Sequence, residues 1–214
     1  MDRFPQAARA GLVPPNELPI WTLLQSDIAH FVRRAESFQG TRASLLRTIS
    51  VLLTPSLLCC VLHRIAHAAH RRRWGAVSRF CARLNALLHR AVLDPQATVG
   101  PGLYVPHPVG VVFRGNAGRN LVLYAGAIVG PLAPLPFPCG GEYECPLLGD
   151  EVMVGMNAMI LGSAVVGHGA RLGPGTLVTG FVKPGTAVIA GQLLARAGTD
   201  AVSPVTAWPP SSSP

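Results

Sequence analysis

One histidine and one aspartate have the types and the setting that hydroxyl chemistry requires. His107 lies between Pro106 and Pro108, and Asp94 precedes it in the chain and is followed by Pro95. A neutral imidazole can take the proton of a hydroxyl as its oxygen attacks, and a carboxylate on the other ring nitrogen fixes the tautomer. From the residues alone, a lone histidine is weak evidence of catalysis. The alternatives are an exposed corner residue for His107 and a residue at a helix exit for Asp94.

Three histidines and two cysteines are the candidate metal ligands. His63, His67 and His70 are spaced to share one face of an expected helix, and three imidazoles could bind zinc. Three consecutive arginines follow them and would repel a cation, so we expect no metal there. Cys139 and Cys145 lack a CxxC partner, and a disulfide, a metal pair and inert thiols all remain open.

Charge and glycine content divide the chain near residue 92. Residues 1–92 contain 13 arginines against 4 acidic residues, whereas residues 93–214 contain 20 of the 23 glycines. The net charge of +8 could suggest nucleic acid, but no recognition motif accompanies it and aromatic residues are only 6%. The most apolar run, residues 51–62, is too short for a membrane span of about 20 residues. The five cysteines lack framework spacing and the first residues lack the apolar run of a signal peptide, so we expect a reduced, cytoplasmic protein.

The expected elements change at the same boundary. Apolar residues at helical spacing predict helices over 20–38, 42–54, 56–72 and 74–93, after a proline-rich lead-in. From residue 93 the period is six, and glycine often follows the repeating aliphatic or small residue. Thirteen of these anchors occur in two series: Leu93, Val99, Val105, Val111, Ala117, Leu123, Val129, and then Leu148, Val154, Ile160, Val166, Leu172, Val178.

This period predicts a solenoid. A six-residue unit makes a short strand and a tight turn, and three units make a triangular coil of about 18 residues. One coil cannot close its own core, so neighbouring coils must stack on it. About five coils fit between residues 93 and 185, and residues 131–147, which separate the two series, are expected to loop out.

Three stretches carry a resemblance to a known family: residues 64–67, 93–112 and 145–162. They are similar to the serine O-acetyltransferases, which are hexapeptide-repeat acyltransferases with a left-handed parallel β-helix. That family has Asp-Ile-His-Pro, then Ile-Gly-x-Gly, then a His followed by x-x-Gly-hydrophobic-Val. This chain has Asp94-Pro95, then Val-Gly-Pro-Gly at 99–102, then His107 followed by Pro-Val-Gly-Val-Val. The resemblance implies an N-terminal α-helical region (1–92), a left-handed parallel β-helix acyltransferase domain (93–197) and a flexible tail (198–214).

The resemblance also implies an activity, namely acetyl transfer from acetyl-CoA to a hydroxyl through a ternary complex. His107 matches the general base and Asp94 the carboxylate that orients it. The family forms trimers, often paired into hexamers, with each active site between subunits, so a homotrimer or larger is expected. The CoA groove is expected near Gly130, Gly155, Met156, Gly175, Thr176 and Lys183. The family's tail ends in Ile and inserts into cysteine synthase, whereas this chain ends in Ser-Ser-Ser-Pro, which argues against that complex.

The acceptor side departs from the family pattern. Pro106 stands where the family has Asp, Glu144 and Cys145 stand where it has Arg-His, and Ala35 stands where it has an acceptor-contacting Asp. Pro106, Glu144 and Cys145 are therefore the expected substrate-binding positions. The leading expectation is acyl transfer from acyl-CoA to the hydroxyl of serine or a related small acceptor, and the altered positions argue against free serine itself. A sugar, glycan or specialised-metabolite intermediate and a non-catalytic scaffold are the alternatives, and a membrane-surface role is the less favoured one.

Overall fold

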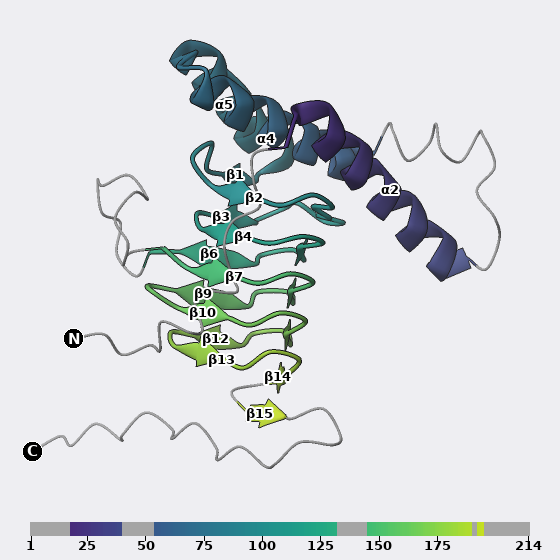
Figure 1. Ribbon diagram of the computed structural model, residues 1–214, viewed down its shortest axis with the longest axis vertical. Helices are drawn as coiled ribbons and strands as arrows, with labels where there is room; N and C mark the ends of the chain where they lie inside the picture. The colour runs from purple at the N-terminus through teal and green to yellow at the C-terminus, as the bar shows by residue number, and fades with distance from the viewer. Residues whose placement is uncertain (1–17, 40–53, 132–144, 190–191, 195–214) are drawn as a thin grey trace, which may run out of the picture.

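Helices come first along the chain and short strands follow. The structure, a computed structural model of the 214-residue chain, describes residues 18–39, 54–131, 145–189 and 192–194. The described helices are α2 (Ile20–Gln39), α4 (Pro55–Arg71) and α5 (Gly75–His89). The strands stack into a column beneath them (Figure 1). The helix expected over 42–54 lies outside the described residues.

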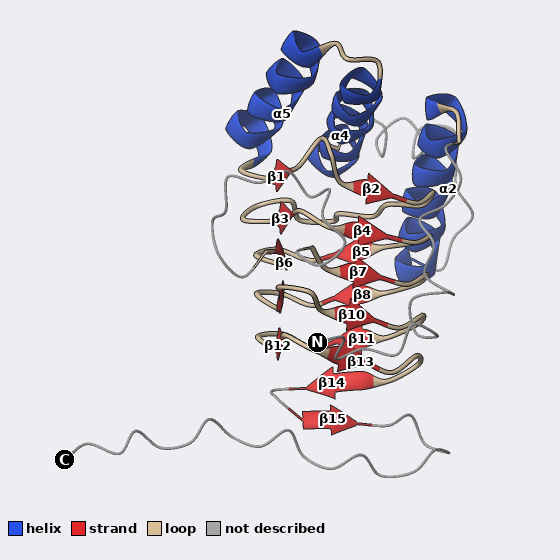
Figure 2. Ribbon diagram, turned by 60° about the vertical axis from the view of Figure 1, so that its left-hand side comes forward, coloured by secondary structure: helices blue, strands red, loops and turns tan. Residues whose placement is uncertain are grey.

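The strands form three sheets that run the length of the column (Figure 2). Sheet 1 contains β1 (Val92–Leu93), β3 (Val112–Phe113), β6 (Ile128–Gly130), β9 (Met159–Leu161) and β12 (Leu177–Val178). Sheet 2 contains β2 (Thr98–Val99), β4 (Asn116–Ala117), β7 (Leu147–Leu148), β10 (Val165–Val166) and β13 (Phe181–Val182). Sheet 3 contains β5 (Val122–Leu123), β8 (Met153–Val154), β11 (Arg171–Leu172), β14 (Ala187–Ile189) and β15 (Gln192–Leu194). All pairs are parallel except β14 with β15, so the predicted parallel β-helix is confirmed.

The chain turns from one sheet to the next at three edges of the column. We call edge 1 the turns from sheet 1 to sheet 2, which begin with residues 94–97. Edge 2 contains the turns from sheet 2 to sheet 3, beginning with residues 100–103, and edge 3 those from sheet 3 to sheet 1, beginning with residues 106–111. In the first coil, a bridge between Tyr104 and Val122 places residues 104–105 against sheet 3.

The register reveals one irregular coil. Thr98 pairs with Asn116, a step of 18 residues. Leu93 instead pairs with Phe113, a step of 20, and Phe113 pairs with Val129, a step of 16. The two extra residues fall in the edge 3 turn at 106–111. This turn is therefore larger than a regular six-residue unit allows.

The hexad anchors form the core of the column, as predicted. All thirteen are buried, with no more than 7% of any of them exposed. Edge 2 is packed so closely that a Cβ on Gly100 would lie 2.6 Å from the carbonyl oxygen of Gly118 in the next coil. A side chain at position 100 would have to push the coils apart, which explains why glycine follows the anchor Val99.

The helices close the upper end of the column, where the first coil has no coil above it. Arg64 of α4 and Asp27 of α2 form a buried ion pair with Nε–Oδ2 at 2.9 Å, and their side chains are 2% and 0% exposed. The guanidinium of Arg64 also donates to the carbonyls of Val99 and Gly100. The carboxylate of Asp27 accepts the N–H groups of Gly102 and Leu103. The polar backbone of the first coil is thereby satisfied without water.

Helix α5 has an unusual distribution of polarity. Its inner side buries Ser78, Cys81, Asn85 and His89, whereas its outer side exposes Val77, Phe80, Leu87 and Leu88. The helix ends at His89, earlier than the expected 93, because Arg90 adopts a left-handed conformation (φ 52°) and β1 begins at Val92. No helix among the described residues is long and apolar enough to cross a membrane.

Candidate functional site

His107 is presented to solvent by the enlarged edge 3 turn. Its side chain is exposed, and the backbone on either side is fixed. The Ser56 hydroxyl of α4 donates to the Pro106 carbonyl at 2.6 Å, and the Gly110 N–H donates to the Arg90 carbonyl at 3.0 Å. The imidazole therefore has an anchored backbone and open access for a substrate, which a general base needs. Sequence reasoning missed Ser56, because a hydroxyl in the first turn of a helix also fits a simple capping role.

Asp94 is held at edge 1 by a different set of partners. Its Oδ1 accepts the Gln96 N–H at 2.8 Å, and its Oδ2 lies 2.8 Å from Nε of Arg114. Arg114 follows Phe113, which pairs with Leu93, so the two side chains stack between successive coils. Sequence reasoning missed this ion pair, because the regular period does not show the 20-residue step that creates it.

The structure does not bring Asp94 and His107 together within one chain. They lie at edges 1 and 3, with the width of sheet 1 between them. No hydrogen bond or ion pair within the described part of the chain joins them. A carboxylate–imidazole pair made from these two residues would therefore need two chains.

The expected donor-binding positions are mostly aligned with His107. Gly155, Met156, Gly175 and Thr176 lie in edge 3 turns further along the column, whereas Gly130 ends β6 beside edge 1 and Lys183 lies at edge 2. Met156 is 50% exposed. The Thr176 hydroxyl is buried and donates to the Gly173 carbonyl at 2.9 Å, so only the backbone of this residue can meet a ligand.

The expected acceptor-binding positions are also divided between edges. Pro106 adjoins His107 at edge 3, and Cys145 lies at edge 1 just before β7. Cys145 is half-buried and disulfide-bonded, so it offers no thiol. Glu144 lies outside the described residues.

A pocket of about 570 Å³ lies on sheet 1 beside the Asp94–Arg114 pair. Its other lining is mainly apolar and includes Val112, Phe113 and Ile128. A mainly apolar pocket with a few polar groups can hold an organic ligand. Clusters of three or more metal-ligating side chains are absent from the described ranges.

Comparisons with known proteins show which chains are similar to this one. The family described as "Bacterial transferase hexapeptide (six repeats)" matches residues 146–180. The serine acetyltransferase of Helicobacter pylori J99 is 29% identical over 141 residues, which is 65% of this chain and 80% of that protein. The one from Synechococcus elongatus is 29% identical over 152 residues, covering 69% of this chain and 60% of that protein. The solved structure of soybean serine acetyltransferase complexed with serine is 26% identical and has a TM-score of 0.67, covering 80% of this chain and 70% of that one.

The similarity to solved structures extends over the helices as well as the column. The predicted architecture, an N-terminal helical region followed by a left-handed parallel β-helix, is confirmed. The hexapeptide family match and the curated relatives identify the kind of enzyme. The chain is a serine acetyltransferase-like hexapeptide-repeat acyltransferase.

Proposed function

We propose that this protein transfers an acetyl group from acetyl-CoA to the hydroxyl of serine or a closely related small acceptor, with His107 as the general base. The observation that carries the proposal is an exposed imidazole on a fixed turn, in a chain similar to serine acetyltransferases. His107 takes the hydroxyl proton while the oxygen attacks the thioester carbonyl. The C–S bond then breaks, and the proton passes from the imidazolium to the CoA thiolate.

The carboxylate partner of His107 comes from a neighbouring protomer in this proposal. Asp94 and His107 lie at different edges, so a trimer with edge 1 of one protomer beside edge 3 of the next would unite them. The exposed apolar side of α5, which includes Phe80 and Leu87, supports burial against further copies of the chain. In such an assembly acetyl-CoA would lie along edge 3, near Gly155 and Gly175.

Two variants test the base and its partner. His107→Ala is expected to lower kcat by roughly 10²-fold or more while acetyl-CoA binding, measured by calorimetry, persists. Mixing His107→Ala with Asp94→Asn protomers before assembly should restore activity, at about one site in four for equal amounts of a trimer. An unchanged rate in His107→Ala would remove the base assignment, whereas absence of any acyl transfer by the unmodified protein would favour the scaffold alternative. Absence of recovery in the mixture would remove the two-chain site.

The acceptor is the least constrained part of the proposal. The solved complex of the soybean relative with serine supports serine. Pro106 beside the proposed base has no charge with which to hold an amino or carboxylate group, which favours a less charged relative of serine. Rates across a panel of hydroxyl compounds, from serine to sugars, would rank the acceptors. The highest kcat/KM for serine would oppose the altered-acceptor argument.

A further inference from the structure

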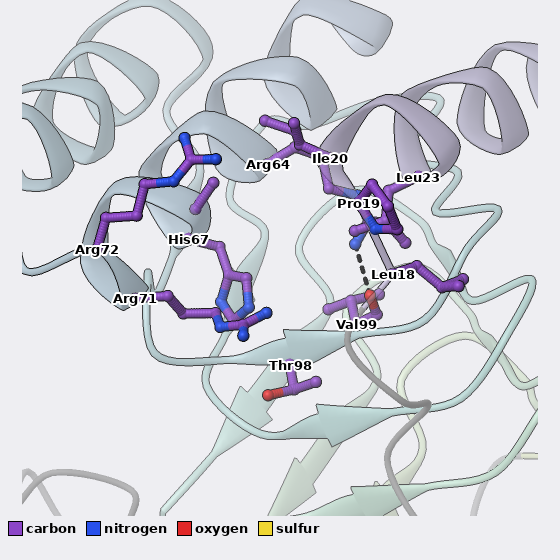
Figure 3. A pocket seen from close by; sticks show the side chains of 11 residues that line it. Leu18, Pro19, Ile20, Leu23, Arg64, His67, Arg71, Arg72, Thr98 and Val99 are labelled. Atoms are coloured by element: carbon purple, nitrogen blue, oxygen red, sulfur yellow. Dashed lines mark hydrogen bonds between the residues drawn. The ribbon is translucent and has the colours of Figure 1, made fainter.

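A basic pocket of about 350 Å³ lies between the start of α2, the last turns of α4 and strand β2 (Figure 3). Thr98 of β2 lines it, so it opens beside sheet 2. Neither His107 nor Asp94 contributes to its lining. The pocket is therefore distinct from the residues proposed for acyl transfer.

Among the described residues, every ionisable side chain that lines this pocket is a base: Arg64, His67, Arg71 and Arg72. The guanidinium of Arg64 already donates to Asp27 and to two backbone carbonyls. Its charge contributes to the field of the pocket, but it has no pair of N–H donors left for a ligand. Arg71 and Arg72 are exposed and end α4. Several bases around one small volume repel one another, and an anion bound among them would remove that repulsion.

His67 is the fourth base of this pocket, and the β-helix fixes the position of its ring. Its Nδ1 lies 2.9 Å from the Pro95 carbonyl, which can only accept, so the proton of the neutral ring is on Nδ1. Burial lowers the pKa of His67, and the charges of Arg64 and Arg71 lower it further. The neighbouring cations thus favour the neutral form of this imidazole.

We propose that this pocket binds a phosphate group, with Arg71 and Arg72 as its charged ligands and Thr98 on its polar side. Guanidinium groups match the oxygens of a phosphate with paired N–H donors. The pocket is also lined by Leu18, Ile20 and Leu23. These apolar side chains fit a phosphate carried on a small organic body better than a free inorganic ion.

The test measures binding, so it is independent of acyl transfer. Inorganic phosphate is titrated into the full chain by isothermal calorimetry at pH 7 and low salt, without and with saturating acetyl-CoA. A saturable site is expected under both conditions. The double variant Arg71→Gln/Arg72→Gln should weaken phosphate binding by roughly tenfold or more. Arg79→Gln/Arg83→Gln is the matched control, because it removes two exposed α5 arginines outside the pocket, and the affinity of this variant should stay within about twofold.

Three results would overturn the proposal. Absence of saturable phosphate binding would remove the site. Equal weakening in Arg79→Gln/Arg83→Gln and in Arg71→Gln/Arg72→Gln would show attraction by net charge alone. Loss of phosphate binding when acetyl-CoA is present would show that the phosphates of the donor occupy the pocket. Thermal melting of each variant confirms that it remains folded, so weaker binding is not mistaken for unfolding.

Discussion

Replacing Asp27 by alanine should loosen the helices from the β-helix. The carboxylate bonds Arg64 through both oxygens, at 2.9 and 3.0 Å, and Oδ1 also accepts the N–H groups of Gly102 and Leu103 at 2.9 and 2.8 Å. The substitution therefore leaves one buried cation without its counter-charge. It also leaves two backbone donors without an acceptor.

The free energy of unfolding should fall by about 3–5 kcal/mol, which is the usual cost of removing one partner from a buried ion pair. The upper end applies here, because an unsatisfied buried donor costs about 1–3 kcal/mol in its own right. Asp27→Asn should cost less than Asp27→Ala. Its amide can keep an oxygen toward Gly102 and Leu103, although its NH₂ group replaces the oxygen that accepted from Nε of Arg64.

Urea unfolding at fixed protein concentration, followed by circular dichroism, measures these differences. Arg119→Ala is the control, because Arg119 pairs with Asp150 at 2.9 Å but its side chain is 66% exposed. Such an exposed pair contributes little to stability, because solvent screens it and two long side chains must be ordered to form it. If Asp27→Ala proved no more destabilising than Arg119→Ala, the buried pair would not be what holds the helices on the first coil.

Two further predictions concern the site and the pH dependence of stability. Ser56→Ala removes the hydroxyl that holds the turn of His107 and should lower kcat roughly tenfold. Ser56→Thr keeps a hydroxyl and should retain most activity. Equal kcat values for the unmodified protein, Ser56→Ala and Ser56→Thr would contradict this prediction. Burial lowers the pKa of His63 well below 6.5, so stability is lost as pH falls below about 6.5, where the unfolded chain takes up a proton first. Below about pH 6.5, His63→Leu should reduce the slope of the free energy of unfolding against pH by about 1.4 kcal/mol per pH unit. Unfolding measured between pH 7.5 and 5 gives this slope, and an unchanged slope would exclude His63 as the source of the loss.

The architecture of the column could be predicted because one physical constraint repeats. Each strand turns one aliphatic side chain inward, so a period of six in hydrophobicity corresponds directly to a period of six in structure. The same regularity concealed the irregular coil. Val111 fits the series and is buried, yet Phe113 occupies the strand position. Two extra residues followed by two missing ones leave the later anchors in phase, so hydrophobicity alone cannot reveal the shift.

The partners of the candidate residues could not be predicted, because they depend on contacts between distant segments. Arg114 meets Asp94 only through the displaced register. The polarity of α5 is a second case, because its apolar stripe suggests a buried side, and the structure exposes Phe80 and Leu87 instead. A stripe indicates that a surface will be covered, but it does not show whether the cover is the same chain or another copy.

Helix α4 links these observations, because it contacts all three edges of the first coil. Ser56 bonds the Pro106 carbonyl at edge 3, Arg64 bonds the Gly100 carbonyl at edge 2, and His67 bonds the Pro95 carbonyl at edge 1. The edge 3 and edge 1 contacts lie one residue from His107 and from Asp94, respectively. Within a single protomer, the relative placement of the two candidate residues is thus fixed by one rigid helix and does not depend on two separate turns. A site built between protomers needs this rigidity, since each chain must present both halves in the correct geometry before they meet.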